Sequence, residues 1–362
     1  MLTLFIKHSG GSFMTLKKLI TITMVTSMLT TCMTGCTTKK NNSTSNNESN
    51  KNVYSISMIT DVAGVNDHSF NQSAWEGLKK AEKDLGVKVK YLESKQDADY
   101  STNVETLVDD GTDLIIGVGS KLAPTIEQAA KDYPDQKFVI VDETYKEIPS
   151  NVESILFKAE QSAYLVGFIA GKMTKTNNVG FIGGMDMSVI NTFKYGYMAG
   201  VKTANSKCKL QSQYANSFSD QAKGKAISNQ MMSNGADVIF IAGGDVGTGA
   251  IEAIKESNKY AIGVDRDQSD LAPDNVLTSA IKRVDIGVYE TAKRFIENKF
   301  EGGKETTYGL KENAVGIPDS TSKLVPQDVL DYVDEAIKKL ESGDIVAPKD
   351  ETEYNRYLNT LK

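Results

Sequence analysis

The sequence is poor in the residues that build disulfide frameworks and metal centres. Its 362 residues include three cysteines, two histidines and one tryptophan. Three cysteines are too few for a disulfide scaffold, so a hydrophobic core must hold the folded part together. His68 has no nearby histidine or cysteine with which to share a metal ion, so we expect no metal site. A nucleophilic serine or cysteine needs a base, most often histidine, and this scarcity argues against that kind of catalysis.

Positive charge is also in short supply. The 41 lysines and arginines are outnumbered by 47 aspartates and glutamates, which gives a net charge of −6. The first 35 residues hold three lysines and no acidic residue, so a chain without them would carry −9. Binding to nucleic acid gains most of its affinity when basic side chains neutralise phosphates. The sequence therefore predicts no nucleic-acid partner.

The N-terminal region has the layout of a secretory signal rather than of a membrane span. A short basic segment begins at Met14, the largely apolar run 19–29 follows, and residues 33–36 read MTGC. The apolar run is shorter than the ~20 residues that a transmembrane helix needs. A short run between a basic segment and a small-residue cleavage site is typical of a signal peptide. We therefore expect residues 1–35 to be removed, with Met14 as the start of translation.

The end of this segment resembles the lipobox of bacterial lipoproteins, in which a cysteine is diacylated and becomes the new N-terminus. Gly35 directly precedes Cys36, whereas Cys32 follows a bulkier residue and is the weaker candidate. Residues 37–52 contain no apolar side chain, so they cannot bury surface to offset the entropy of ordering. We expect a lipidated, palmitate-bearing Cys36, a flexible tether over 36–52, and a location on the extracytoplasmic face of the cell membrane.

From residue 53 onward, short apolar runs alternate with segments of helical periodicity. Several runs are apolar throughout, which is typical of parallel strands covered on both faces. Repeated β-α-β units predict an α/β fold with doubly wound parallel sheets. The expected strands are 53–60, 87–93, 113–119, 137–142, 177–183, 209–215, 237–242, 260–265 and 276–282. The expected helices are 69–85, 101–110, 121–132, 160–174, 189–205, 220–234, 247–258 and 284–298.

The series of strands and helices divides into two similar halves. The ~310 residues after the expected tether are enough for two domains. We interpret the halves as two Rossmann-like lobes that face each other across a ligand cleft, with the first crossing in 150–160. The segment 276–312 looks like a return to the first lobe. The expected N-terminal lobe is 53–155 plus 277–312, and the expected C-terminal lobe is 156–276 plus 313–362.

Polar residues gather where the expected strands end. In an open parallel sheet, ligands bind beyond the carboxyl ends of the strands. Four strands end at or beside a carboxylate, namely Asp61, Asp142, Asp245 and Asp265, and another ends at Lys282. These side chains suit a ligand rich in hydroxyl or amine groups better than a highly anionic one. The sequence therefore predicts a polar cleft lined by strand-end residues.

A glycine-rich loop follows the expected strand 237–242. Residues 243–249 read GGDVGTG, which lacks the lysine-containing end of a P-loop and does not fit the dinucleotide fingerprint. Gly243 and Gly244 are better interpreted as places where backbone N–H groups approach a ligand closely. We therefore expect no phosphate or dinucleotide cofactor.

Some of these residues also have a purely structural interpretation. Asp67 is expected to cap the first helix, since its carboxylate can accept from free backbone N–H groups. Phe70 lies in the first turn of that helix and could be a staple or core residue. Asp61 and Asp265 could cap following helices, although an unpaired carboxylate at the end of a buried strand would be costly.

Five stretches, in order along the chain, resemble a known family. They are 67–77 (DHSFNQSAWEG), 179–186 (VGFIGGMD), 235–244 (GADVIFIAGG), 261–268 (AIGVDRDQ) and 276–285 (VLTSAIKRVD). In these stretches the chain looks like the basic membrane protein family of bacterial substrate-binding lipoproteins, which includes the purine nucleoside receptors. The similarity runs through essentially all of 53–340. It implies a type I periplasmic-binding-protein fold and a binding protein, not an enzyme, that delivers a nucleoside to the permease of an ABC importer.

The resemblance also implies roles for single residues. Phe70 and Phe240 are expected to stack on the two faces of the nucleoside base. Asp61 and Asp265 are expected to contact the ribose, with Lys282 nearby. The full set of implied contacts, in which Asp142 is the candidate for the base edge, is Asp61, Asn66, Phe70, Asn71, Asp142, Phe240, Gly243, Gly244, Asp265 and Lys282.

The preferred ligand is a purine nucleoside of the guanosine, inosine or adenosine class, bound by a monomer without cofactor. Other ligands stay open, because some members of the family bind riboflavin and receptors for sugars or autoinducers share the fold. A nucleoside-cleaving enzyme is the alternative from another class. It would need a cluster of metal-binding aspartates near the N-terminus, and residues 61–67 (DVAGVND) are too sparse for that.

We predict that Cys36 is the site of lipid attachment. In cells, Cys36→Ala should release the protein or leave an unprocessed precursor, because the thiol that carries the lipid is gone. Labelling with a palmitate analogue checks this, with Cys32→Ala as the matched control that keeps its label. Continued labelling of the Cys36→Ala protein would contradict the assignment.

Overall fold

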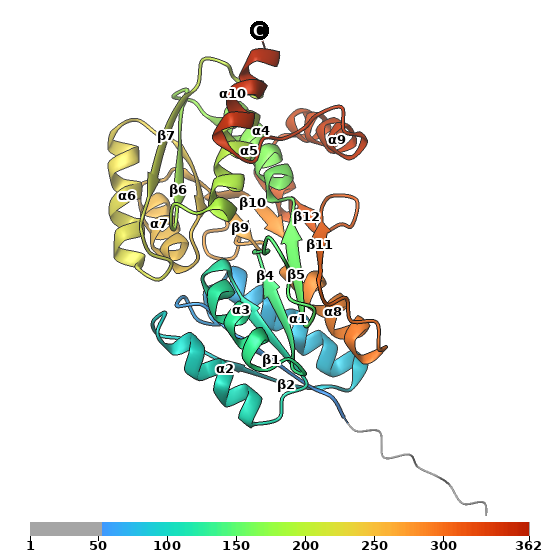
Figure 1. Ribbon diagram of the computed structural model, residues 1–362. Coiled ribbons are helices and arrows are strands. Elements are labelled where there is room, and N and C mark those ends of the chain that lie inside the picture. Colours follow the sequence, from blue (N-terminus) through green and yellow to red (C-terminus); the bar gives the residue numbers. More distant parts are fainter. Residues whose placement is uncertain (1–52, 362) are drawn as a thin grey trace, which may run out of the picture. The chain divides into compact units, whose positions relative to one another are not determined.

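The computed structural model describes residues 53–361, which form two α/β lobes (Figure 1). The expected signal peptide, lipidation site and tether lie outside these residues. Each lobe is built on one six-stranded sheet with helices on both faces. Within 53–361, no helix combines the length and the apolar character needed to cross a bilayer.

The sheet of the N-terminal lobe has the strand order β11-β5-β4-β3-β1-β2, and all its neighbouring strands are parallel. Parallel pairing follows from the helices that connect its strands, since each crossover returns the chain to the same edge. The strands are β1 (Ser55–Ile59), β2 (Lys88–Leu92), β3 (Leu114–Val118), β4 (Lys137–Val141), β5 (Val152–Phe157) and β11 (Lys304–Tyr308).

The sheet of the C-terminal lobe has the order β12-β10-β9-β8-β6-β7. Its strands are parallel except for β12, a short edge strand that runs antiparallel to β10. The strands are β6 (Asn178–Gly183), β7 (Lys209–Tyr214), β8 (Val238–Ala242), β9 (Tyr260–Asp265), β10 (Val276–Lys282) and β12 (Val315–Gly316).

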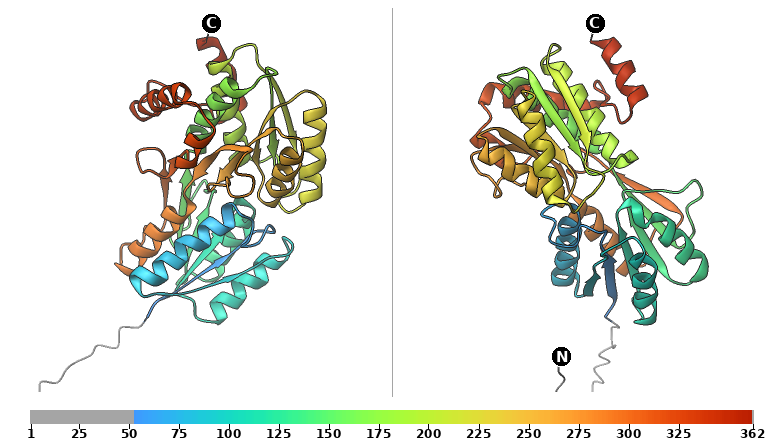
Figure 2. Two further views of the ribbon diagram at one scale, coloured as in Figure 1. Left: turned by 180° about the vertical axis from the view of Figure 1, so that it is seen from behind. Right: turned by 90° about the vertical axis from the view of Figure 1, so that its left-hand side faces the viewer.

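The helices cover both faces of each sheet. In the N-terminal lobe these are α1 (Phe70–Leu85), α2 (Asp99–Asp109), α3 (Ala123–Asp132) and α8 (Val284–Ile296). In the C-terminal lobe they are α4 (Ala159–Met173), α5 (Ser188–Ala204), α6 (Gln221–Ser233), α7 (Asp245–Glu256), α9 (Gln327–Ser342) and α10 (Glu351–Thr360). Two 3₁₀ turns, Ser120–Leu122 and Asp319–Lys323, complete the set. Both views in Figure 2 place α9 and α10 with the C-terminal lobe, away from α1.

Side-chain alternation along the strands divides the core between the two faces of each sheet. In β3, Ile116 packs with the helices α1 and α8, whereas its neighbour Ile115 packs with α2 and α3. In β8, Phe240 packs with α4 and α5, whereas Ile239 packs with α6 and α7. Because both faces are covered, these strands are apolar throughout, which is the pattern that the sequence shows.

All nine expected strands and all eight expected helices are confirmed, with ends that shift by a few residues. The remaining strands β5, β11 and β12 and the helices α9 and α10 were not predicted from the sequence. The strand β5 was expected to be a crossing. It includes Glu153 and Ser154, which break its apolar run, yet both are buried. Glu153 pairs there with Arg294 of α8, so a buried ion pair takes the place of apolar contacts.

The expected lobe boundary at residue 277 is wrong. The strand β10 pairs with β9 in the second sheet as far as Ile281, which lies opposite Asp265. Residues 277–282 therefore belong to the C-terminal lobe. The chain returns to the N-terminal lobe at Arg283, where α8 begins to pack beside α1. The first crossing similarly follows Phe157, the last residue of β5, and not residue 155. Sequence periodicity marks where a strand lies but does not say with which sheet it pairs.

Close helix packing in the C-terminal lobe depends on glycine. A Cβ atom added at Gly200 of α5 would lie 2.0 Å from the carbonyl oxygen of Tyr164 in α4. One added at Gly167 of α4 would lie 2.1 Å from the carbonyl oxygen of Tyr197 in α5. Both distances are far inside van der Waals contact with backbone atoms, which cannot move aside as a flexible side chain can. The two helices therefore touch backbone to backbone.

We predict that Gly200→Ala lowers the free energy of unfolding by about 1–3 kcal/mol, because the new methyl group forces α4 and α5 apart. Gly247→Ala in α7 is the matched control, since its Cβ would meet only Ile241, at 3.7 Å. That control should be neutral or stabilise the protein by about 0.5–1 kcal/mol. Urea unfolding of the two variants and the wild type measures both effects. Equal stability of the two variants would contradict the packing argument.

Candidate ligand-binding site

A pocket lies between the two lobes at the carboxyl ends of their parallel strands. It encloses about 550 Å³, including its opening to solvent. Its position is the one expected for open parallel sheets, where helices start and strands stop. From the N-terminal lobe it is lined by Asp61, Ala63, Asp67, Phe70, Gly119, Ser120, Lys121 and Asp142. From the C-terminal lobe it is lined by Val189, Ile190, Phe193, Phe218, Ala242, Gly243, Gly244, Val264, Asp265 and Lys282.

A buried cation occupies one end of the pocket. The Lys282 Nζ atom lies 2.5 Å from Asp142 Oδ2 and 3.4 Å from Asp265 Oδ1, and all three side chains are less than a tenth exposed. Lys282 and Asp265 come from the C-terminal lobe, whereas Asp142 follows β4 in the N-terminal lobe. Burial alone would lower the pKa of Lys282, but attraction to the two carboxylates outweighs it and raises that pKa above its usual value. The lysine is therefore charged and ties the two lobes together.

The two carboxylates of this cluster sit on unusual backbone. Asp142 has a φ of 65° and Asp265 a φ of 63°, both in the left-handed region that L residues rarely adopt. Such conformations persist where the surrounding structure compensates for them, and they are frequent at binding sites. Asp265 accepts a hydrogen bond from Ser69 Oγ at 2.5 Å through Oδ2. Its Oδ1 atom is buried and accepts no hydrogen bond from residues 53–361, so a ligand donor would complete it.

A second polar group occupies the other end. The Asn71 amide donates to Asp61 Oδ1 at 2.8 Å and to Asp67 Oδ2 at 3.0 Å. Asp67 also accepts from the backbone N–H groups of Ser69, Asn71 and Gln72, so the expectation that it caps α1 is confirmed. Burial raises the pKa of Asp67 to about 7, against the hydrogen bonds that favour its charged form. Burial likewise raises the pKa of Asp61.

Phe70 lies between these two ends. Its ring is half-buried, lines the pocket, and lies 4.4 Å from Lys282 Nζ, measured to the ring centroid. On the other side the ring approaches Gly119, where an added Cβ would lie 3.4 Å from it and 3.7 Å from Asp61 Oδ2. The start of α1 therefore places an aromatic ring in the pocket lining, close to both Lys282 and Gly119.

The expectation that Phe240 is the second stacking ring is wrong. Phe240 is fully buried, does not line the pocket, and packs against the rings of Phe181, Phe193 and Tyr197 at centroid distances of 5.2 to 6.0 Å. It lies two residues before the end of β8, and its side chain points to the face that α4 and α5 cover. Its place in the strand therefore directs it into the core rather than towards the cleft.

Two other aromatic residues of the C-terminal lobe line the pocket instead. Phe193 of α5 is almost fully buried, whereas Phe218, in the loop after β7, is half-buried. Of these two rings, Phe218 therefore has more exposed surface that a ligand could contact. It stands alone in the polar stretch 216–221 (NSFSDQ) just beyond a strand end. Applying the strand-end rule to β7 could have identified it.

The glycine-rich loop supports Phe218. Gly243 and Gly244 line the pocket, as expected, and Gly244 has a φ of 57°. An added Cβ at Gly184 would lie 2.3 Å from the Phe218 ring, so that residue must be glycine for the ring to sit there. The backbone N–H of Asp245 also donates to the Phe218 carbonyl at 2.8 Å. The Phe218 ring therefore packs against Gly184, and the Phe218 backbone is held by the glycine-rich loop.

Two expected contact residues lie elsewhere. Asn66 is exposed and does not line the pocket, because the turn before Asp67 points its side chain to solvent. Asn71 is fully buried behind the pocket wall, where it bridges Asp61 and Asp67. It therefore positions two carboxylates rather than lining the cavity itself. Among residues 53–361, no cluster of three histidine, cysteine or carboxylate side chains is arranged to hold a metal ion.

The chain resembles known proteins over most of its length. The family model described as ABC transporter substrate-binding protein PnrA-like matches residues 54–351. The CD4+ T-cell-stimulating antigen of Listeria monocytogenes is 43% identical over 317 residues, covering 82% of this chain and 88% of that protein. The ABC transporter nucleoside-binding protein BmpA of Lactococcus lactis is 40% identical over 315 residues, covering 81% and 88%.

A solved structure agrees with the fold. An ABC transporter solute-binding protein from Aeropyrum pernix superposes with a TM-score of 0.77 at 28% identity, covering 85% of this chain and 97% of that one. The expected type I periplasmic-binding fold of two α/β lobes is thereby confirmed. Strand-end carboxylates around an interlobe pocket are what such a protein needs to hold a small solute. The chain belongs to the PnrA-like family of ABC transporter substrate-binding proteins, which capture solutes and are not enzymes.

Proposed function

We propose that this protein binds a nucleoside, with a purine preferred, and delivers it to the permease of an ABC importer. The observation that carries the proposal is that each lobe contributes an aromatic ring with free surface to the lining of the pocket. Phe70 enters from the N-terminal lobe and Phe218 from the C-terminal lobe, and both are half-buried. A flat base can stack on both rings at once and so join the lobes.

The polar ends of the pocket suit the two parts of a nucleoside. Asp265 Oδ1 is a buried acceptor without a hydrogen-bond donor from residues 53–361, and Lys282 joins it to Asp142. Hydroxyl groups of a ribose would donate to this pair of carboxylates, so we assign the sugar to that end. The structure groups Asp142, rather than Asp61, with Asp265. Asp61 lies across the Phe70 ring, where it can accept from an N–H group on the edge of the base.

The charge of the pocket favours a neutral ligand. The lining contains four carboxylates and two lysines, Lys121 and Lys282. Lys121 already forms an ion pair with Asp97 at 2.7 Å, and Lys282 is shared between two carboxylates. A phosphate would meet unpaired negative charge, which is costly in a buried site. The site therefore fits a nucleoside better than a nucleotide.

The anchored location belongs to the same proposal. A lipid on Cys36 and a tether over 36–52 would keep a monomeric binding protein beside its permease on the extracytoplasmic face of the membrane. Release would require the lobes to part. Three connections between the lobes, after β5, before α8 and after β11, form the hinge for that motion.

We predict that Phe70→Ala and Phe218→Ala each weaken guanosine binding by about 10- to 100-fold. Base–aromatic stacking contributes roughly 1–3 kcal/mol for each ring removed. Phe240→Leu is the matched control, because it changes a core ring outside the pocket and should leave affinity nearly unchanged while lowering stability. Calorimetric titration with guanosine checks all three variants. Unchanged affinity of both alanine variants would remove these rings from the site.

We also predict that the ribose hydroxyls are recognised at Asp265. Guanosine should bind more tightly than 2′-deoxyguanosine, and guanine should bind most weakly, because each lost donor leaves a buried acceptor unpaired. One such loss costs about 1–3 kcal/mol. Asp265→Asn should weaken guanosine binding and narrow its advantage over the deoxy compound. Asparagine tolerates the left-handed backbone at this position, so the fold should persist.

Titration of wild type and Asp265→Asn with the three compounds measures the difference. Asp61→Asn serves as the comparison, since a residue at the base end should weaken guanosine and deoxyguanosine equally. If wild type bound all three compounds with equal affinity, the sugar would not be recognised, and a base or flavin such as riboflavin would become the better candidate.

A further inference from the structure

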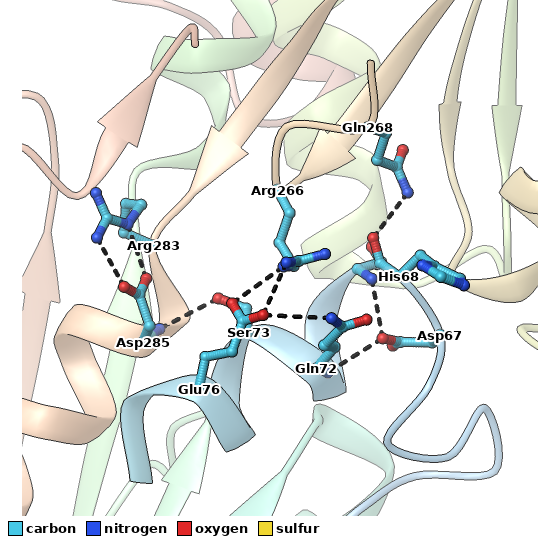
Figure 3. A network of polar contacts seen from close by, with 10 residues as sticks. Asp67, His68, Gln72, Ser73, Glu76, Arg266, Gln268, Arg283 and Asp285 are labelled. Carbon is cyan, nitrogen blue, oxygen red and sulfur yellow. Dashed lines mark hydrogen bonds and ion pairs between the residues drawn. The ribbon is translucent and has the colours of Figure 1, made fainter. Parts of the chain in front are cut away.

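A second set of contacts joins the lobes at the rim of the pocket, outside its lining. Arg266, in the loop after β9, forms a bidentate ion pair with Glu76 of α1, with N–O distances of 2.7 and 3.1 Å (Figure 3). Nearby, the Gln268 side chain donates to the backbone carbonyl of His68 at 3.1 Å. None of these four residues lines the pocket. Both contacts run from the C-terminal lobe to the N-terminal lobe.

Each partner of the ion pair is also held by a contact within its own lobe. Glu76 accepts a hydrogen bond from Gln72, one turn earlier in α1, at 3.2 Å. The backbone N–H of Arg266 donates to the Val264 carbonyl at 2.7 Å, which closes a tight turn centred on Asp265. A bidentate geometry between a planar guanidinium and a carboxylate is the strong form of such a pair. The contact is thus specific in direction rather than a chance encounter of surface charges.

The same two segments carry both the rim contacts and the ligand contacts. In the N-terminal lobe, Phe70 faces the pocket and Glu76 follows it in the same helix. In the C-terminal lobe, Asp265 faces the pocket and Arg266 is the next residue. Gln268, which is 2% exposed, accepts from the Val264 N–H at 3.0 Å and so connects its own loop to the end of β9. Any ligand that brings these segments together also brings Glu76 and Arg266 together.

We propose that the Glu76–Arg266 ion pair, supported by the Gln268–His68 hydrogen bond, is a latch that forms when the lobes close. It slows reopening and so lengthens the residence of the ligand without touching it. Glu76 and Arg266 are positioning residues, because they act on the ligand only by holding the two lobes closed. The inference rests on the proposed function for the choice of ligand only, since it concerns closure around whatever the pocket holds.

The exposure of the pair sets the size of the effect. The side chains of Arg266 and Glu76 are 26% and 46% exposed, so solvent and salt screen their attraction. Pairs of this kind shift an equilibrium by about two- to fivefold. An adjustment of that size is useful in a binding protein, because a much tighter latch would hinder transfer to the permease.

The test compares dissociation rates in the full-length protein. Glu76→Gln, Arg266→Gln and the double variant are each loaded with guanosine, and its release is followed by stopped-flow displacement. Both single variants should release guanosine about two- to fivefold faster than wild type at low salt, and the double variant should match them. At about 1 M salt, where the Debye length is near 3 Å, the difference from wild type should vanish.

Two matched variants make the result specific. Lys225→Gln breaks an ion pair of similar exposure with Glu256, at 2.9 Å, that lies wholly inside the C-terminal lobe. It should leave release unchanged. The charge swap, Glu76→Arg combined with Arg266→Glu, should restore slow release, which a mere packing defect would not allow.

Wild-type release rates in both single variants would overturn the latch, as would equal acceleration in Lys225→Gln or an acceleration that persists at high salt. If guanosine does not bind, the proposed function fails, and the same variants are compared with riboflavin as the probe. Faster, salt-sensitive release of riboflavin would then support the latch even though the nucleoside assignment had failed.

Discussion

The burial of the Lys282 ammonium between carboxylates of both lobes constrains the rest of the molecule. An isolated ammonium at that depth would lose its hydration without compensation, and Asp142 and Asp265 supply the opposite charge that it needs. They follow strands of different sheets, and the carboxyl ends of β4, β9 and β10 therefore have to meet at one point. The pairing of β10 with β9 in the second sheet places Lys282 at this point, directly before the chain crosses to α8 in the N-terminal lobe.

The same cluster shows what the fold supplies to the pocket. Asp142 and Asp265 both have left-handed backbone, a conformation that costs of order 1–3 kcal/mol at each residue. The cost is offset by continuous parallel pairing on both sides of each strand, so the sheets hold the two carboxylates where an isolated loop would not. Asp265 still lacks one donor from residues 53–361, and a ligand hydroxyl would supply it. Ligand affinity and closed geometry thus depend on the same charges.

Much of this could be predicted from the sequence, and the failures have identifiable causes. The alternation of strand-like runs with helical periodicity marked nine of the strands, and the strand-end rule found Asp61, Asp142, Asp265 and Lys282, which all line the pocket. Phe240 was misplaced because a motif gives a position in a strand but not the face to which the side chain points. Phe218, the ring that lines the pocket instead, lies in a loop, where no helical or strand periodicity marks it. Sheet membership of β10 and the burial of β5 depend on long-range pairing, which no local pattern records.

The two kinds of interlobe contact differ in what they can do. The pair of Lys282 and Asp142 is almost fully buried, so separating it on opening exposes both charges to water and disrupts the binding site itself. Changing that pair would alter what is bound. The pair of Glu76 and Arg266 is partly exposed and lies outside the pocket lining, so its strength changes the balance between open and closed forms without altering the pocket. A binding protein must both hold and release its ligand. Because one ion pair shapes the pocket and the other lies outside it, specificity and residence time can vary independently.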